Sequence, residues 1–225
     1  MDTATGGGQP TAHGRGVLAR HHGSVDPRRI GLLGGESSGK TTLAMGLADA
    51  LPAFVAEEYL RDFVRDFGRV PTLADQEGIF LTQQMTVSTV ERAAEYANTP
   101  WVIADPLPLM TAVYSIVYFE DDSLLAAGIA DASTYDAVLW CAPDFAWVND
   151  EGVRDSVEHR DQADNVIAEN IAPVLPLIHV SGTPLERVTS SLEALKHWRP
   201  RARLDSPGVR QGDTRGARGR GRPGQ

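Results

Sequence analysis

The chain has 225 residues, 42% of them hydrophobic, which is enough for one sizeable core, so we expect a single folded domain. Its formal net charge of −9 is unevenly placed, because residues 30–195 hold eight basic and 26 acidic side chains, a net of −18 that disfavours nucleic acid as a partner. The single cysteine excludes a disulfide framework, and the absence of a long apolar run or a signal core predicts a cytoplasmic protein without a membrane partner.

The two ends of the chain differ in composition from the middle. Residues 1–28 are rich in glycine and histidine with few apolar side chains, which predicts a disordered leader. Residues 197–225 form a basic Arg/Gly-rich stretch, and we expect a disordered tail without a specific nucleic-acid function. Residues 29–196 remain as the folded domain.

The first predicted strand, residues 29–33, runs into a G-x-x-x-x-G-K-[ST] pattern followed by helical periodicity over residues 42–51. This strand, loop and helix order is typical of a phosphate-binding loop. Lys40 is expected to reach the β- and γ-phosphates of ATP, and the Thr41 hydroxyl to ligate Mg²⁺. The predicted nucleotide-binding residues are Gly34, Gly35, Glu36, Ser37, Ser38, Gly39, Lys40, Thr41 and Thr42.

A second apolar stretch, residues 53–57, is followed by the polar cluster Glu58, Tyr59 and Arg61. The carboxyl ends of strands are where α/β sheets bind ligands, so this cluster is a candidate substrate site. A long helix is predicted from about Pro71 to Tyr96, with Gln83 on its core-facing side. That glutamine is either a satisfied buried amide or a ligand contact, and the pattern leaves both open.

Residues 101–105 read as a buried strand that ends in Asp105, the natural Walker B carboxylate and second Mg²⁺ ligand. Pro106 stands where motor and AAA-type ATPases usually place a glutamate that polarises water. No lysine lies between Lys40 and Lys196, which excludes the usual guanine-reading element of a GTPase. Transfer of phosphate to an alcohol is therefore favoured, with Glu58 or Asp105 as the proton acceptor.

The second half of the chain continues the alternation of helix and strand. A polar segment at about 144–162 reads as a lid whose Arg154 and Arg160 neutralise the γ-phosphate, although solvated loop arginines are the simpler alternative. Helices are predicted at 107–119, 123–135, 164–174 and 184–195, and strands at 137–141, which contains a buried Cys141, and at 175–180. Five strand–helix alternations predict an α/β, three-layer P-loop kinase-like domain with a five-stranded, mainly parallel sheet.

Several of these segments together resemble one family. The stretch 34–43 (GGESSGKTTL), the Glu-Tyr-x-Arg element at 58–61, Asp75 with Gln83, Asp105, and Trp147-Val148 with Arg154 look like the ribosylnicotinamide kinase domain of NadR-like proteins over residues 29–195. The resemblance implies ATP-dependent phosphorylation of the 5′-hydroxyl of nicotinamide riboside, giving nicotinamide mononucleotide for NAD salvage. It implies a nucleoside site formed by Glu58, Tyr59, Arg61, Gln83 and Trp147.

The sequence departs from that family at two points. Leu107 stands where NadR-like kinases often have a second aspartate, and no H-x-G-H element of an adenylyltransferase occurs, so we expect that the chain does not make NAD by itself. A kinase for another nucleoside, or a regulatory ATP-binding module with slow ATPase activity, remains an alternative. The oligomeric state is left open.

Overall fold

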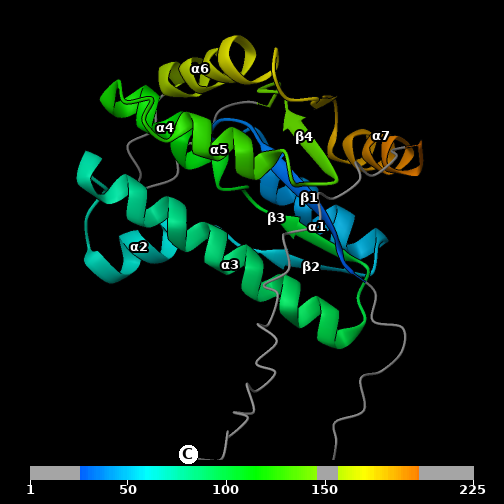
Figure 1. Ribbon diagram of the computed structural model, residues 1–225. Coiled ribbons are helices and arrows are strands. Elements are labelled where there is room, and N and C mark those ends of the chain that lie inside the picture. The colour runs from blue at the N-terminus through cyan, green and yellow to red at the C-terminus, as the bar shows by residue number, and fades with distance from the viewer. Residues whose placement is uncertain (1–25, 146–156, 198–225) are drawn as a thin grey trace, which may run out of the picture.

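The computed structural model describes residues 26–145 and 157–197. Five parallel strands form one sheet in the order β2-β3-β1-β4-β5. Figure 1 labels β2, β3, β1 and β4 of this sheet. The predicted α/β fold with a five-stranded parallel sheet is confirmed, and β1 and β3 are neighbours as expected. The strands are β1 (Arg28–Leu33), β2 (Ala53–Ala56), β3 (Trp101–Ala104), β4 (Ala137–Cys141) and β5 (Ile178–Val180).

Helices cover both faces of the sheet and give three layers (Figure 1). The helices α1 and α7 pack on one face, and α3, α4, α5 and α6 pack on the other. The described helices are α1 (Lys40–Ala50), α2 (Tyr59–Phe67), α3 (Gln76–Ala97), α4 (Leu109–Phe119), α5 (Leu125–Ala132), α6 (Val157–Val166) and α7 (Pro184–His197), with a 3₁₀ turn η1 (Leu73–Asp75) and a π-helical turn η2 (Ile167–Ile171). In the described part of the chain, no helix is long and apolar enough to cross a bilayer.

The alternation of side chains along β1 explains why its sequence is continuously apolar. Ile30 and Leu32 pack toward α1 and α7, whereas Leu33 packs toward α4 and α6. Successive side chains of a strand point to opposite faces, and both faces of this sheet are covered. Cys141 at the end of β4 is buried and free, as predicted.

Two elements differ from the sequence prediction. The pattern after β2 predicts a polar cluster, but residues 59–67 form the amphipathic helix α2, in which Phe63 is buried and Arg65 pairs with Asp62 on the exposed side. The helix predicted to begin at 164 begins at Val157 instead. The polar character of its first turns predicts a lid instead of a helix, and only Ala163 of α6 is fully buried.

The predicted leader and tail lie outside the described residues, except at their inner ends. Strand β1 begins at Arg28, whose backbone N–H donates to the carbonyl of Pro100, and α7 ends at His197. Arg154 and Trp147 also lie outside the described residues.

Candidate active site

The phosphate loop connects β1 to α1, and its backbone demands glycine at two positions. Gly34 has φ +143° and Gly39 has φ +82°, conformations that L side chains rarely adopt. A Cβ at Gly34 would lie 2.8 Å from the Cys141 carbonyl oxygen, so space excludes a side chain as well. The Ser38 hydroxyl closes the loop by donating to the Gly35 carbonyl over 2.7 Å.

The positive end of α1 and one ammonium group provide the charge of this loop. Helix α1 has no acidic residue in its first turn, so its N-terminal partial charge is not offset there. Lys40 Nζ donates to the carbonyl oxygens of Gly34 and Gly35, at 2.8 Å each. These hydrogen bonds hold the Lys40 ammonium group against the phosphate loop.

Asp105 and Thr41 lie together because β1 and β3 are adjacent strands. Burial raises the pKa of Asp105, against the opposing effects of the Thr41 hydroxyl beside its carboxylate and of Lys40. Within residues 26–145 and 157–197, Asp105 Oδ1 is buried and has no hydrogen-bond partner.

A hydroxyl beside a carboxylate with a free oxygen fits the hard oxygen ligands of Mg²⁺. The described residues contain no cluster of three or more His, Cys, Asp or Glu that could hold a metal. Phosphate oxygens and water would have to complete the coordination, as is usual for this ion. The predicted pair of metal ligands thus fits a metal–nucleotide complex better than a free metal ion.

A pocket with about 700 Å³ of empty space, partly open to solvent, adjoins the phosphate loop. Helices α2, α3 and α4 form most of its wall, and the Glu36 and Glu58 carboxylates are its acidic groups. The remaining wall is mainly apolar and aromatic, which is the usual character of a small-molecule site. The lining residues are Glu36, Glu58, Leu60, Val70, Pro71, Gln76, Ile79, Gln83, Pro106, Met110, Thr111, Tyr114, Tyr118 and Phe119.

Glu36 links the phosphate loop to this pocket. It is a loop residue between Gly35 and Ser37, yet its Oε1 accepts a hydrogen bond from the Tyr114 hydroxyl at 3.3 Å. The Tyr114 ring in turn lies 5.9 Å from the Tyr118 ring, and both line the pocket. One carboxylate therefore touches both the expected nucleotide site and the expected acceptor site.

Glu58 stands at the N-terminus of α2, on the pocket wall. Burial raises its pKa; the nearby Glu36 acts in the same direction, and Lys40 and Arg61 oppose it. Arg61 Nε lies 3.3 Å from Glu58 Oε2, but the Arg61 side chain is 65% exposed. A carboxylate with a raised pKa is a better proton acceptor, so the structure suits Glu58 to the role of a base.

Gln83 resolves one alternative that the sequence left open. Its Oε1 accepts the backbone N–H of Tyr59 at 2.8 Å, and its Nε2 donates to the carbonyls of Glu57 and Pro106 at 3.2 and 3.0 Å. The Gln83 amide is therefore hydrogen-bonded to the segments that follow β2 and β3. Gln83 still lines the pocket, where it holds Glu57 and Pro106 in place.

The other predicted substrate residues separate into two groups. Glu58 lines the pocket with Gln83, whereas Tyr59 and Arg61 do not. Leu107, where NadR-like kinases often carry an aspartate, is fully buried in the core formed with α4. The acidic character of the pocket comes instead from Glu36 and Glu58.

Arg160 lies on α6 against the phosphate loop. Its backbone carbonyl is 2.9 Å from the place that a Cβ on Gly35 would occupy, and its Nη1 donates to the Phe145 carbonyl at 3.1 Å. The part of the predicted lid from residue 157 onward is thus a helix packed beside the loop. Contact of Arg160 with a γ-phosphate stays a prediction.

Sequence reasoning missed Tyr114, Tyr118 and the fully buried Arg187. The two tyrosines share a helix face because they are four residues apart, but α4 is largely apolar, so its pattern did not single them out. Arg187 lies within the helix predicted at 184–195, and no local pattern there indicates its burial.

Comparison with known proteins places the chain in a family. A family model described as an AAA domain matches residues 29–186. The chain belongs to this AAA domain family. No protein of curated function matches its sequence significantly.

Solved structures show the same fold. A NadR protein in complex with NR matches with a TM-score of 0.62 at 22% identity, over 77% of this chain and 51% of that one. A NadR protein in complex with NAD and AMP-PNP matches with a TM-score of 0.58 at 23% identity, over 77% of this chain and 49% of that one. The AAA domain thus has the P-loop fold of NadR and spans about half of the NadR length, which confirms the predicted fold.

Proposed function

We propose that this AAA domain is an ATP-dependent kinase that transfers the γ-phosphoryl group of ATP to a hydroxyl of a small molecule. The observation that carries the proposal is the partly open, mainly apolar and aromatic pocket that adjoins the phosphate loop through Glu36. An ATPase that uses water as its acceptor has no need of an aromatic-lined pocket beside the γ-phosphate. Pro106, next to Asp105, also leaves no carboxylate at the position from which AAA-type ATPases activate water.

The proposed transfer uses groups that the chain brings together. Lys40 and the N-terminus of α1 hold the phosphates, and Thr41 with Asp105 would hold Mg²⁺, which neutralises charge on the phosphates. The acceptor oxygen forms a bond to the γ-phosphorus while the bond to the β-γ bridging oxygen breaks. Glu58 or Asp105 takes the hydroxyl proton, and ADP leaves.

The proposed acceptor is nicotinamide riboside, phosphorylated on its 5′-hydroxyl. Its pyridinium ring carries a fixed positive charge, and the pocket offers the carboxylates of Glu36 and Glu58 together with three aromatic rings of α4. Such rings stabilise a cation placed over their faces, by about 0.5–2 kcal/mol each. The similarity in fold to NadR, solved with NR, supports the same choice.

The test compares nicotinamide riboside with uridine and cytidine as acceptors at equal concentration. We expect phosphorylation of nicotinamide riboside to exceed that of either uncharged nucleoside, and we expect E36Q to reduce this preference. If the uncharged nucleosides reacted as well or better, the acceptor assignment would be wrong while the kinase proposal stood. Slow ADP formation that no acceptor stimulates would instead indicate a regulatory ATP-binding module.

A further inference from the structure

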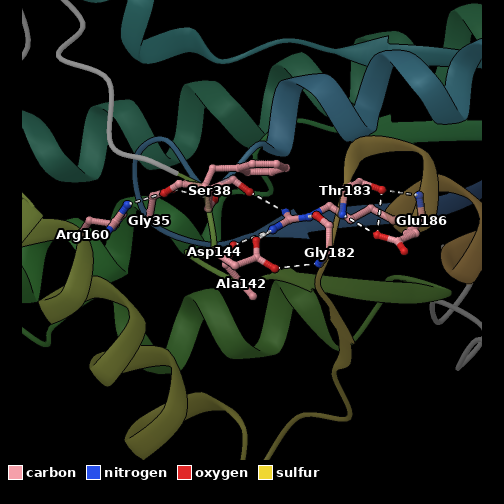
Figure 2. Close-up of polar contacts among 10 residues, drawn as sticks. Gly35, Ser38, Ala142, Asp144, Arg160, Gly182, Thr183 and Glu186 are labelled. Atoms are coloured by element: carbon pink, nitrogen blue, oxygen red, sulfur yellow. Dashed lines mark hydrogen bonds and ion pairs between the residues drawn. The ribbon is translucent and has the colours of Figure 1, made fainter.

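Arg187 on α7 is a charged side chain with only 1% of its surface exposed. Its guanidinium donates through Nη1 to the Ser38 carbonyl at 2.6 Å, through Nη2 to the Ala142 carbonyl at 2.8 Å, and through Nε to the Gly182 carbonyl at 2.9 Å. Nη2 also pairs with Asp144 Oδ1. Figure 2 shows these groups converging from the phosphate loop, the chain after β4 and the chain after β5.

This arrangement compensates the cost of burying the charge. A buried guanidinium is tolerated when it is paired and its donors are satisfied. Asp144 supplies the negative charge, and its Oδ2 is itself fixed by the backbone N–H of Gly182 at 2.6 Å. The Phe145 ring covers the guanidinium, with 4.2 Å between the guanidinium carbon and the ring centroid.

The phosphate loop is the part of the site that this cluster touches. Ser38 lies inside the loop and is completely buried. Phe145 is also packed against Gly39, because a Cβ there would lie 2.6 Å from the Phe145 ring. Arg187 and Phe145 therefore contact the loop at two successive residues, directly before Lys40.

Attachment of α7 to the domain does not need the guanidinium. Val188, Leu192 and Leu195 on the same helix pack with α1 and the sheet in one apolar cluster. The polar contacts of Arg187 go instead to loop carbonyls, which have no partners in a regular strand or helix.

We propose that Arg187 is a positioning residue that holds the phosphate loop in its nucleotide-binding conformation without touching the nucleotide. The proposal rests on the proposed nucleotide site. A loop held ready in advance binds more tightly, because its ordering cost is not paid at the moment of binding. Lysine cannot replace this function, since an ammonium lacks the planar fork that reaches three carbonyls and a carboxylate together.

The test is the affinity of R187K for AMP-PNP with Mg²⁺, measured by titration calorimetry at a temperature at which circular dichroism shows the protein folded. We expect Kd to rise about ten- to hundredfold, from the loss of charge-assisted hydrogen bonds. The matched control is R92K, which changes an exposed arginine of α3 and should leave Kd unchanged. A lower melting temperature with a wild-type Kd would show a merely structural role and overturn the proposal.

A second variant covers the case in which R187K does not fold. D144N keeps the shape of the partner but removes its charge, and we expect Kd for AMP-PNP to rise about three- to tenfold. An unchanged Kd in folded D144N would overturn the proposal. Because AMP-PNP binding involves no acceptor, a failure of the kinase proposal would show separately, as wild-type protein that binds AMP-PNP but phosphorylates no nucleoside.

Discussion

Replacing Glu58 by glutamine should make the protein more stable at neutral pH and less active. Burial raises the pKa of Glu58 above its ordinary 4.5, with Glu36 adding to the rise. A carboxyl group with a raised pKa in the folded state contributes its stabilisation below pH 4.5, and loses it as the pH rises through the raised pKa. Above that pKa the buried charge opposes folding, and glutamine removes the charge.

The ion pair between Arg61 and Glu58 offsets only a small part of the destabilisation that the buried Glu58 charge causes. The Arg61 side chain is 65% exposed, and exposed pairs contribute about 0–1 kcal/mol. Thermal unfolding of wild type and E58Q at pH 5 and pH 8 measures the net effect of the Glu58 charge on stability. We expect the melting temperature of E58Q to exceed that of wild type by more at pH 8 than at pH 5. Asp105 and Asp131 also have raised pKa values, but they are present in both proteins and cancel in the comparison.

The same variant tests the catalytic role of Glu58. Loss of a general base lowers kcat by about 10²- to 10⁴-fold, and the KM for ATP should change little. The matched variant is D105N, which should also raise the Mg²⁺ requirement. If E58Q were less stable than wild type at pH 8 and kept its kcat, both the burial argument and the assignment as base would be refuted.

The remaining predictions concern other parts of the site. K40A should abolish AMP-PNP binding in calorimetry, and T41A should raise the Mg²⁺ concentration that gives half-maximal activity; normal binding by K40A would contradict the phosphate-loop assignment. If Arg160 neutralises the γ-phosphate, R160A should lower kcat by on the order of 10³-fold with nearly unchanged ATP affinity, whereas an unchanged kcat would contradict that role. L107A should cost about 2–5 kcal/mol in denaturant unfolding without altering the acceptor KM, because Leu107 is fully buried away from the pocket; a changed KM would show that this residue does shape the pocket.

Local sequence patterns were sufficient to predict the position of the phosphate loop and the approach of Asp105 to it. The phosphate loop, the strand before it and Asp105 after β3 each depend on neighbours in the chain, and parallel pairing of β1 with β3 brings them together. The sequence of α2 is amphipathic, but its charged side chains at 58–62 equally fit a ligand site at the end of a strand, so the local pattern does not decide between the two.

The acceptor half and the support of the loop depend on contacts between distant residues. Tyr114 and Glu36 are 78 residues apart, and Arg187 and Ser38 are 149 residues apart. The spacing of apolar residues along the sequence does not predict such contacts, because they form only when α4 and α7 pack on their faces of the sheet. For the same reason, the sequence could not show that the Gln83 amide is already satisfied.

The most direct test of the kinase proposal follows the label of γ-³²P-ATP in the presence of nicotinamide riboside. We expect label to appear on the nucleoside, in a one-to-one ratio with ADP, and the labelled product to be nicotinamide mononucleotide. Label that appears only as inorganic phosphate, at a rate independent of nicotinamide riboside, would contradict the kinase proposal.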